Sequence, residues 1–187
     1  MPLKQPLRAD TIFLLHDFLG TEECAAFISL SETTGYEEAM ITTPSGPKML
    51  KAIRNNDRLI WDDEALAAQW WQRAKAFIPD IDGWRGCGMN ERFRFYRYTP
   101  GQLFARHRDG SFQRSEAESS RMTFMVYLNA GYSGGCTRFG RDKPGDLTVE
   151  PRSGTALVFR HDLMHEGEEV SDGVKYVLRT DVMYQRV

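Results

Sequence analysis

The sequence has little cysteine and no long hydrophobic segment near its start. The three cysteines, Cys24, Cys87 and Cys136, are an odd number without paired spacing. No disulfide framework or zinc motif is therefore expected, and a reducing, cytoplasmic compartment is the simplest expectation. The apolar run from Ile12 to Leu15 is only four residues long and is followed by His16-Asp17. We therefore expect neither a signal peptide nor a membrane-spanning segment.

An excess of charge of one sign is also missing. The chain has 24 Lys and Arg against 26 Asp and Glu, a formal net charge of -2. This balance does not indicate a surface for nucleic acid or for an anionic membrane. The 187 residues, 41% of them hydrophobic, fit one globular domain. We find no repeat and no linker, and expect one domain over 1–187, with a helical support region at 1–90 and a β-barrel core at 91–187.

Two helices are predicted in the first half of the chain. Thr21 can cap a helix that ends near Gly35. A second helix is expected to begin near Asp62-Asp63, because apolar residues then recur at helical intervals as far as Ile78, where Pro79 follows. Residues 42–48, which read TTPSGPK, are expected to form a loop between the two helices.

The second half changes to short runs rich in Val, Thr, Phe and Tyr, each bounded by Gly, Pro, Asp or Asn. This alternation is typical of an antiparallel β-sandwich or barrel. The predicted class is therefore mostly β with flanking α-helices. The expected strands are Arg92–Tyr98, Met122–Asn129, Leu147–Glu150, Thr155–Phe159 and Val174–Tyr184.

Three polar residues suggest a metal site in this β-rich half. His107 and Asp109 are two positions apart, so an extended segment presents both on one face. His165 follows 58 residues later, just after a predicted strand. Two histidines and one carboxylate leave coordination positions open, which is the arrangement of oxygen-activating non-haem iron sites.

Other interpretations of the same residues stay open. A lone H-x-D is common, and His161 competes with His165 because the two form an i, i+4 pair. The segment between them leaves a strand and has no helical pattern, so His165 is preferred. A structural zinc site is disfavoured because no cysteine lies near the cluster.

Two further function classes fit parts of the sequence. Residues 131–135, GYSGG, fit the G-x-S-x-G nucleophile motif, with Asp146 or Asp162 and then His165 in hydrolase order. That motif needs a helix after the serine, and residues 136–145 are a poor helix. A non-enzymatic, cupin-like module that binds a metal or ligand through the same three residues is the other alternative.

A set of ordered motifs resembles the prolyl 4-hydroxylase-like family of iron(II)/2-oxoglutarate dioxygenases. The resemblance covers most of the chain and is strongest from Asn90 to Tyr184, with Cys136 as a departure where many relatives carry glutamate. An RNNDR stretch at 54–58 also looks like a segment of relatives. The motifs are RYTPGQ at 97–102, HRDG at 107–110, MVYLN at 125–129, GG at 134–135 with TRF at 137–139, ALVF at 156–159, HEG at 165–167 and KYVLRTDVMY at 175–184.

The resemblance implies a double-stranded β-helix (jelly-roll, cupin-like) fold with Fe(II) held by His107, Asp109 and His165. It implies 2-oxoglutarate and dioxygen as co-substrates, with ascorbate as a further cofactor. The implied reaction hydroxylates an unactivated C–H bond and releases succinate and carbon dioxide. The primary substrate, a peptide or a small molecule, would be a prolyl residue or an amino-acid-like compound. Because related halogenases lack the carboxylate, Asp109 favours hydroxylation.

The resemblance also implies which residues bind 2-oxoglutarate. Its far carboxylate needs a buried cation, and Lys175 stands at the family position about ten residues after the second histidine. Arg179 has the same parity on the same strand and is the rival anchor. Tyr98 and Tyr127 match family positions whose hydroxyls line the co-substrate pocket, and Thr123 has the strand parity of Tyr127.

Overall fold

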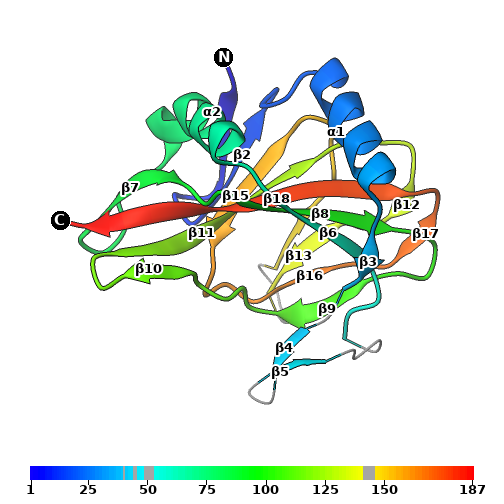
Figure 1. Cartoon of the computed structure of the whole chain (residues 1–187). Helices are drawn as coiled ribbons and strands as arrows, with labels where there is room; N and C mark the ends of the chain where they lie inside the picture. The colour runs from blue at the N-terminus through cyan, green and yellow to red at the C-terminus, as the bar shows by residue number, and fades with distance from the viewer. Residues whose placement is uncertain (40, 44–45, 49–52, 141–145) are drawn as a thin grey trace.

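The computed structural model describes residues 1–39, 41–43, 46–48, 53–140 and 146–187 (Figure 1). Two β-sheets face each other, and two helices lie on the outer side of the larger sheet. The predicted jelly-roll fold with flanking helices is confirmed. Among helices in the described ranges, none is both long enough and apolar enough to cross a membrane.

The larger sheet contains ten strands. Its main path runs β1 (Leu3–Arg8), β2 (Ile12–His16), β15 (Ala156–Arg160), β11 (Glu118–Tyr127), β18 (Lys175–Arg186), β8 (Arg92–Tyr98), β6 (Asp57–Asp62) and β3 (Glu37–Glu38). Off this path, β10 (Gln113–Ser115) pairs with β11, and β7 (Trp84–Met89) pairs with β18. The predicted strands of the second half are confirmed within a few residues at their ends.

The smaller sheet faces the inner side of the larger one (Figure 1). Its order is β14 (Leu147–Val149), β13 (Thr137–Phe139), β16 (His165–Gly167) and β9 (Phe104–His107). Two ribbons complete the fold: β12 (Ser133–Gly134) with β17 (Val170–Asp172), and β4 (Ile41–Thr43) with β5 (Gly46–Lys48).

Strand periodicity divides the interior into two layers. On β11, Phe124 and Val126 point towards the helices, whereas Thr123 and Tyr127 point towards the smaller sheet, as alternation along a strand requires. Strand β18 behaves in the same way, because Leu178, Val182 and Tyr184 enter the helix-side core. Lys175, Val177 and Arg179 of the same strand face the other sheet. The polar functional groups are therefore gathered between the two sheets.

The helices cover the apolar outer face of the large sheet. Helix α1 (Thr21–Thr34) begins at Thr21, the predicted cap, and the cap itself is Gly20, whose N–H donates to the Glu23 carboxylate at 3.0 Å. Helix α2 (Glu64–Ala74) is capped by Asp63, whose Oδ1 accepts from the Leu66 N–H at 2.8 Å, and a 3₁₀ turn (Lys75–Phe77) follows it.

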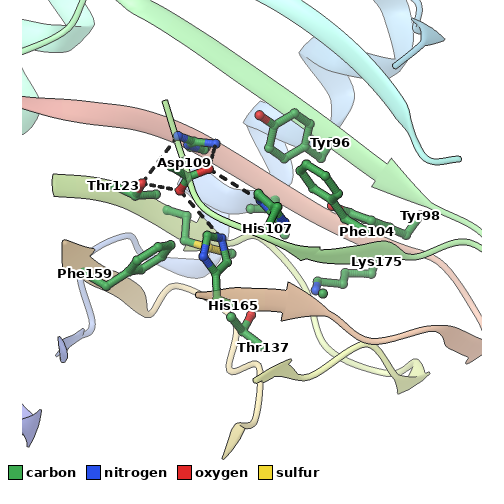
Figure 2. Close-up of a pocket in the computed structure, with 14 residues that line it drawn as sticks. Tyr96, Tyr98, Phe104, His107, Asp109, Thr123, Thr137, Phe159, His165 and Lys175 are labelled. Carbon is green, nitrogen blue, oxygen red and sulfur yellow. Dashed lines mark hydrogen bonds and ion pairs between the residues drawn. The ribbon is translucent and has the colours of Figure 1, made fainter. Parts of the chain in front are cut away.

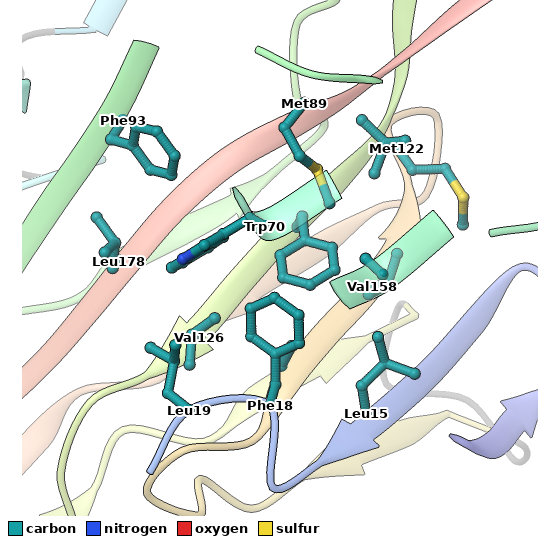
Figure 3. Close-up of a cluster of buried hydrophobic side chains, with 14 of the residues drawn as sticks. Leu15, Phe18, Leu19, Trp70, Met89, Phe93, Met122, Val126, Val158 and Leu178 are labelled. Carbon is teal, nitrogen blue, oxygen red and sulfur yellow. The ribbon is translucent and has the colours of Figure 1, made fainter. Parts of the chain in front are cut away.

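The fully buried Trp70 of α2 fills the centre of this layer (Figure 3). Its ring makes an edge contact with Phe18 at 5.1 Å between centroids and with Phe93 at 5.2 Å. Edge-to-face contacts of this kind add to the stabilisation that comes from burial of the ring. The layer carries no functional group and acts as the support of the sheet.

The first half differs from its predicted description in two respects. Residues 42–48 were expected to be a loop, but 41–43 and 46–48 form the β4–β5 ribbon, and residues 44–45 lie outside the described residues. The helical support region at 1–90 also contributes β1, β2, β3, β6 and β7 to the large sheet. Local patterning showed the helices but not these strands, which owe their position to pairing with distant parts of the chain.

Candidate metal centre and its cavity

The three predicted metal ligands lie together between the sheets (Figure 2). His107 ends β9 and His165 begins β16, and the two residues are direct partners in the antiparallel register. Asp109 follows His107 by two residues. One ligand atom from each side chain falls within a group whose members are all within 4.8 Å of one another.

Backbone carbonyls fix the orientation of both imidazoles. Nδ1 of His107 lies 2.8 Å from the Ala105 carbonyl, and Nδ1 of His165 lies 3.1 Å from the Leu163 carbonyl. A carbonyl oxygen only accepts, so Nδ1 of each ring is the donor, and in the neutral ring Nε2 is left with its lone pair for a metal. The Nε2 atoms lie 3.5 and 3.6 Å from the Asp109 carboxylate oxygens.

The Asp109 carboxylate is ionised and held from both sides. Arg179 Nη1 donates to Oδ1 at 2.8 Å, and Thr123 Oγ1 donates to Oδ2 at 2.5 Å. Burial acts to raise the pKa of this carboxyl, but the adjacent Arg179 cation outweighs burial and brings the pKa well below its ordinary value. An anionic oxygen donor is therefore available.

Burial also keeps His165 neutral. It lowers the pKa of the imidazole to about 4, and the nearby Asp109 charge offsets this only in part. At neutral pH the ring needs to lose no proton before it binds a cation. Two neutral imidazole nitrogens and a carboxylate are a donor set that fits a divalent transition metal such as Fe(II).

His161, the alternative ligand, is occupied elsewhere. Its Nδ1 lies 3.1 Å from Thr123 Oγ1, and its Nε2 lies 3.1 Å from Ser120 Oγ. It is not part of the group formed by the other three residues. The geometry thus agrees with the preference for His165, and His161 instead packs behind the hydroxyl that supports Asp109.

A cavity adjoins the three ligands. It takes in four of the five residues predicted for 2-oxoglutarate: Tyr98, Thr123, Lys175 and Arg179. Tyr127 does not line it, but the Tyr127 hydroxyl lies 2.7 Å from Thr137 Oγ1, and Thr137 does. The remaining lining residues are Tyr96, Phe104, Met125, Phe159, Gly167 and Val177, with the three ligands.

Lys175 is a buried cation in this cavity. Only 2% of the residue is exposed, and its ammonium group donates to the Gly135 carbonyl at 2.7 Å. The nitrogen lies 5.1 Å from the centre of the Tyr98 ring and 5.6 Å from that of Tyr127. Burial lowers its pKa to about 8. No carboxylate among the described residues forms an ion pair with it, so it can receive an anionic ligand.

The two candidate anchors have different surroundings. Arg179 is engaged by Asp109 at 2.8 Å and by Asp181 at 3.1 Å. Lys175 stands four residues away on β18, about 13 Å along an extended strand. Lys175 is thus the cation available at a distance from the metal ligands, whereas Arg179 is committed beside them.

Some cavity residues were missed from the sequence. Tyr96 has the strand parity of Tyr98, which is a signal that could have identified it. Phe104 stacks on His107 with ring centres 3.5 Å apart, but nothing in the local pattern distinguishes it from a core residue. Thr137 lies on β13, which pairs with β16, and only that long-range pairing brings it to the cavity.

The hydrolase interpretation lacks its structural context. Ser133 belongs to the short strand β12, and β13 follows at residues 137–139, where the nucleophile motif requires a helix. Ser133 is also absent from the described residues around the histidines. The site is a candidate metal centre with an adjoining cavity that contains the buried cation Lys175.

Comparison with known proteins agrees with this geometry. Residues 93–180 match the family model described as 2OG-Fe(II) oxygenase superfamily. A comparison of the sequence with curated proteins gave no match. Among solved structures, the fold is similar to a Pseudomonas putida prolyl-4-hydroxylase, at 18% identity and a TM-score of 0.67, with 95% of this chain and 93% of that one covered.

Two further structures share the fold. A prolyl hydroxylase from Trichoplax adhaerens, in complex with a fragment of the hypoxia inducible factor oxygen degradation domain, gives a TM-score of 0.70 at 14% identity, covering 94% of this chain and 84% of its own. The viral collagen prolyl hydroxylase of Paramecium Bursaria Chlorella virus-1, as a 2OG complex, gives 0.62 at 19%, covering 94% and 96%. The family match over 93–180 and the shared fold of the whole chain both support a 2-oxoglutarate-dependent dioxygenase of prolyl 4-hydroxylase-like fold.

Proposed function

We propose that the protein hydroxylates an unactivated C–H bond of an amino-acid-like or prolyl substrate, with His107, Asp109 and His165 holding Fe(II). The observation that carries this proposal is the convergence of these three side chains, within 4.8 Å, at a cavity that also contains the buried cation Lys175. The bound iron supplies activation of dioxygen and oxidation of the C–H bond, coupled to conversion of 2-oxoglutarate to succinate and carbon dioxide.

The chain's own residues bind and orient the reactants. Lys175 neutralises the far carboxylate of 2-oxoglutarate, and the Thr137 and Tyr98 hydroxyls lie in the same cavity to donate hydrogen bonds. Phe159 and Val177 give the cavity apolar walls, which exclude water from the reacting end. Thr123 and Arg179 hold Asp109 in one orientation. Ascorbate has no binding group of its own in this proposal and would serve as a reductant from solution.

The experiment is an anaerobic titration of Fe(II) in the presence of 2-oxoglutarate, followed through the visible charge-transfer band of the chelate. We expect a band in the parent, no band in His165→Ala and a weakened band in Lys175→Ala. A band lost in Arg179→Ala but kept in Lys175→Ala would move the anchor to Arg179. A parent that binds iron and 2-oxoglutarate but releases no succinate with any substrate would favour the cupin-like binding module.

A further inference from the structure

A second, wider cleft opens beside the same metal ligands. It shares five residues with the smaller cavity: His107, Asp109, Tyr96, Phe104 and Arg179. Unlike that cavity, it is lined by many cations. The arginines are Arg54, Arg58, Arg94, Arg108 and Arg179, against two carboxylates, Asp109 and Asp181.

Both carboxylates of the cleft are already engaged. Arg179 bonds Asp109 and Asp181 at 2.8 and 3.1 Å, and Arg94 bonds Asp181 at 3.3 Å. The acids therefore balance the charges of Arg94 and Arg179, and those of the remaining arginines are in excess. The arginines of the cleft also lower the pKa of the Tyr96 hydroxyl. Burial acts to raise this pKa, but the charges of Arg179, Arg54 and Arg94 outweigh burial.

Arg54 is the most buried of these cations. The residue is 5% exposed, and its guanidinium carbon lies 4.6 Å from the centre of the Tyr96 ring and 4.3 Å from that of Phe104. Its Nε donates to Asn56 Oδ1 at 2.7 Å. Its Nη2 is buried and has no hydrogen-bond partner among the described residues. A buried donor left unpaired costs about 1–3 kcal/mol, which is offset when a ligand supplies the acceptor.

Arg58 is the second cation without a fixed partner. It lies on β6 opposite Tyr96 of β8 and is half-buried. No carboxylate in the described part of the chain comes within ion-pair distance of it. Burial lowers the pKa of its guanidinium, and the neighbouring Arg54 and Arg94 charges lower it further, while Tyr96 and Glu37 act in the opposite sense without outweighing them. An anion beside Arg58 would relieve this repulsion.

The rim of the cleft is apolar. Ile53 and Phe112 line this rim. They are 38% and 41% exposed and belong to the few large hydrophobic side chains that are exposed among the described residues. A ligand there can place carbon against the rim and an anionic group against the arginines. The planar fork of a guanidinium matches the two oxygens of a carboxylate.

We propose that this cleft receives the primary substrate, and that the substrate carries a carboxylate bound by Arg58 with Arg54 beside it. The proposal rests on the proposed function for the statement that the occupant is the substrate of the iron site. The carboxylate belongs either to a small free acid or to the terminus or an acidic side chain of a peptide. In both cases the C–H bond to be oxidised lies between the anionic group and the iron.

The test compares probes that differ only in charge. N-acetyl-L-proline and its neutral twin N-acetyl-L-prolinamide are titrated calorimetrically into the protein, first alone and then anaerobically with Fe(II) and saturating 2-oxoglutarate. We expect the acid to bind at least tenfold more tightly than the amide and to weaken as salt is raised. Peptides with an internal proline, with and without a glutamate, distinguish the peptide source from the free acid.

Arg58→Gln should abolish the preference for the acid, and Arg58→Lys should restore part of it. Arg85→Gln is the control, because Arg85 is exposed and lies outside the cleft. Thermal melting confirms that each variant is folded. The proposal would be overturned if acid and amide bound equally, or if neither bound. It would also be overturned if inorganic phosphate bound more tightly than any carboxylate, or if the preference for the acid survived Arg58→Gln. Because the arginines do not depend on iron, a failed iron titration with an intact charge preference would count against the proposed function alone.

Discussion

Arg179 donates to one oxygen of Asp109 at 2.8 Å, while Thr123 donates to the other at 2.5 Å. The carboxylate of the candidate iron site is thus fixed by two residues of the large sheet, although Asp109 itself follows a strand of the small one. The sequence leaves Arg179 as a rival of Lys175 for binding the far carboxylate of 2-oxoglutarate. Its contacts give it a different task, the positioning of a metal ligand.

Removing either contact should weaken metal binding without unfolding the protein. We expect Thr123→Val, which keeps the side-chain shape, to lower Fe(II) affinity by about tenfold, and Arg179→Gln by about 10–100-fold, as is usual for groups that orient a ligand. Competition with a chromophoric chelator measures the affinity. Met125→Leu, at a neighbouring cavity position, is the control. Unchanged affinity in both variants would show that Asp109 needs no support.

Lys175 should control the affinity for 2-oxoglutarate. Truncating a buried charge partner costs about 2–5 kcal/mol, so Lys175→Met should raise the KM for 2-oxoglutarate by roughly 30-fold or more. Lys175→Arg keeps the cation and should lose less. If the two variants behave alike, charge at this position is not what binds the co-substrate.

The pKa of Lys175 gives this affinity a pH dependence. With the pKa lowered to about 8, the side chain is a cation below that pH and becomes neutral above it. The cation binds the dianion, so KM for 2-oxoglutarate should be flat below pH 8 and rise above it by about tenfold per pH unit. The pH profile of KM measures this, and Lys175→Arg should flatten it. A profile unchanged by that substitution would assign the titration to another group.

His161 and His165 should differ sharply in their effect on iron. His161 makes hydrogen bonds to Ser120 and Thr123 and points no free nitrogen to the ligand group. We therefore expect His161→Gln to keep the iron content of the parent, and His165→Gln to lose it. Metal analysis after dialysis against Fe(II) under nitrogen decides the matter. The reverse pattern would exchange the roles of the two residues.

The helix-side core should be separable from the site. Trp70 is fully buried between α2 and the large sheet, and Trp70→Ala should lower the free energy of unfolding by about 3–5 kcal/mol. Urea denaturation followed by far-UV circular dichroism measures this free energy. Arg85→Ala is the control, because Arg85 is exposed at the surface. A loss below about 1 kcal/mol would mean that the layer repacks around the cavity.

His107 and Asp109 could be predicted because they depend on short-range geometry, whereas His165 followed from its place in the family motifs and meets them only through the β9–β16 pairing. An H-x-D pair on an extended segment presents both side chains together whatever the rest of the fold does. Lys175 and Tyr98 followed from family motifs, and the structure adds that they are direct partners in the β18–β8 register. Helix α2 could be predicted because its apolar period and the Pro79 that follows are local signals, although the α-helix ends at Ala74 and a 3₁₀ turn takes its place as far as Phe77.

What could not be predicted depends on pairing between distant strands. The arginine cleft combines residues from β6, β8, β18 and the segment after β9, and no local pattern states that these segments meet. The same holds for Thr137, and for the strands of the first half that enter the large sheet. The position of Tyr127 behind Thr137 depends on side-chain packing, which strand parity alone does not resolve.

The two walls of the site belong to sheets of very different size. Strands β11 and β18 have ten and twelve residues and pair along most of their length, whereas β9 and β16 have four and three. Both histidines stand on the short strands, so a cation bound between them would cross-link the wall that is built from the shorter strands. Hydrogen exchange should therefore slow on metal binding in β9 and β16 and change little in β18. In this fold the catalytic ion would also stabilise the small sheet that carries two of its own ligands.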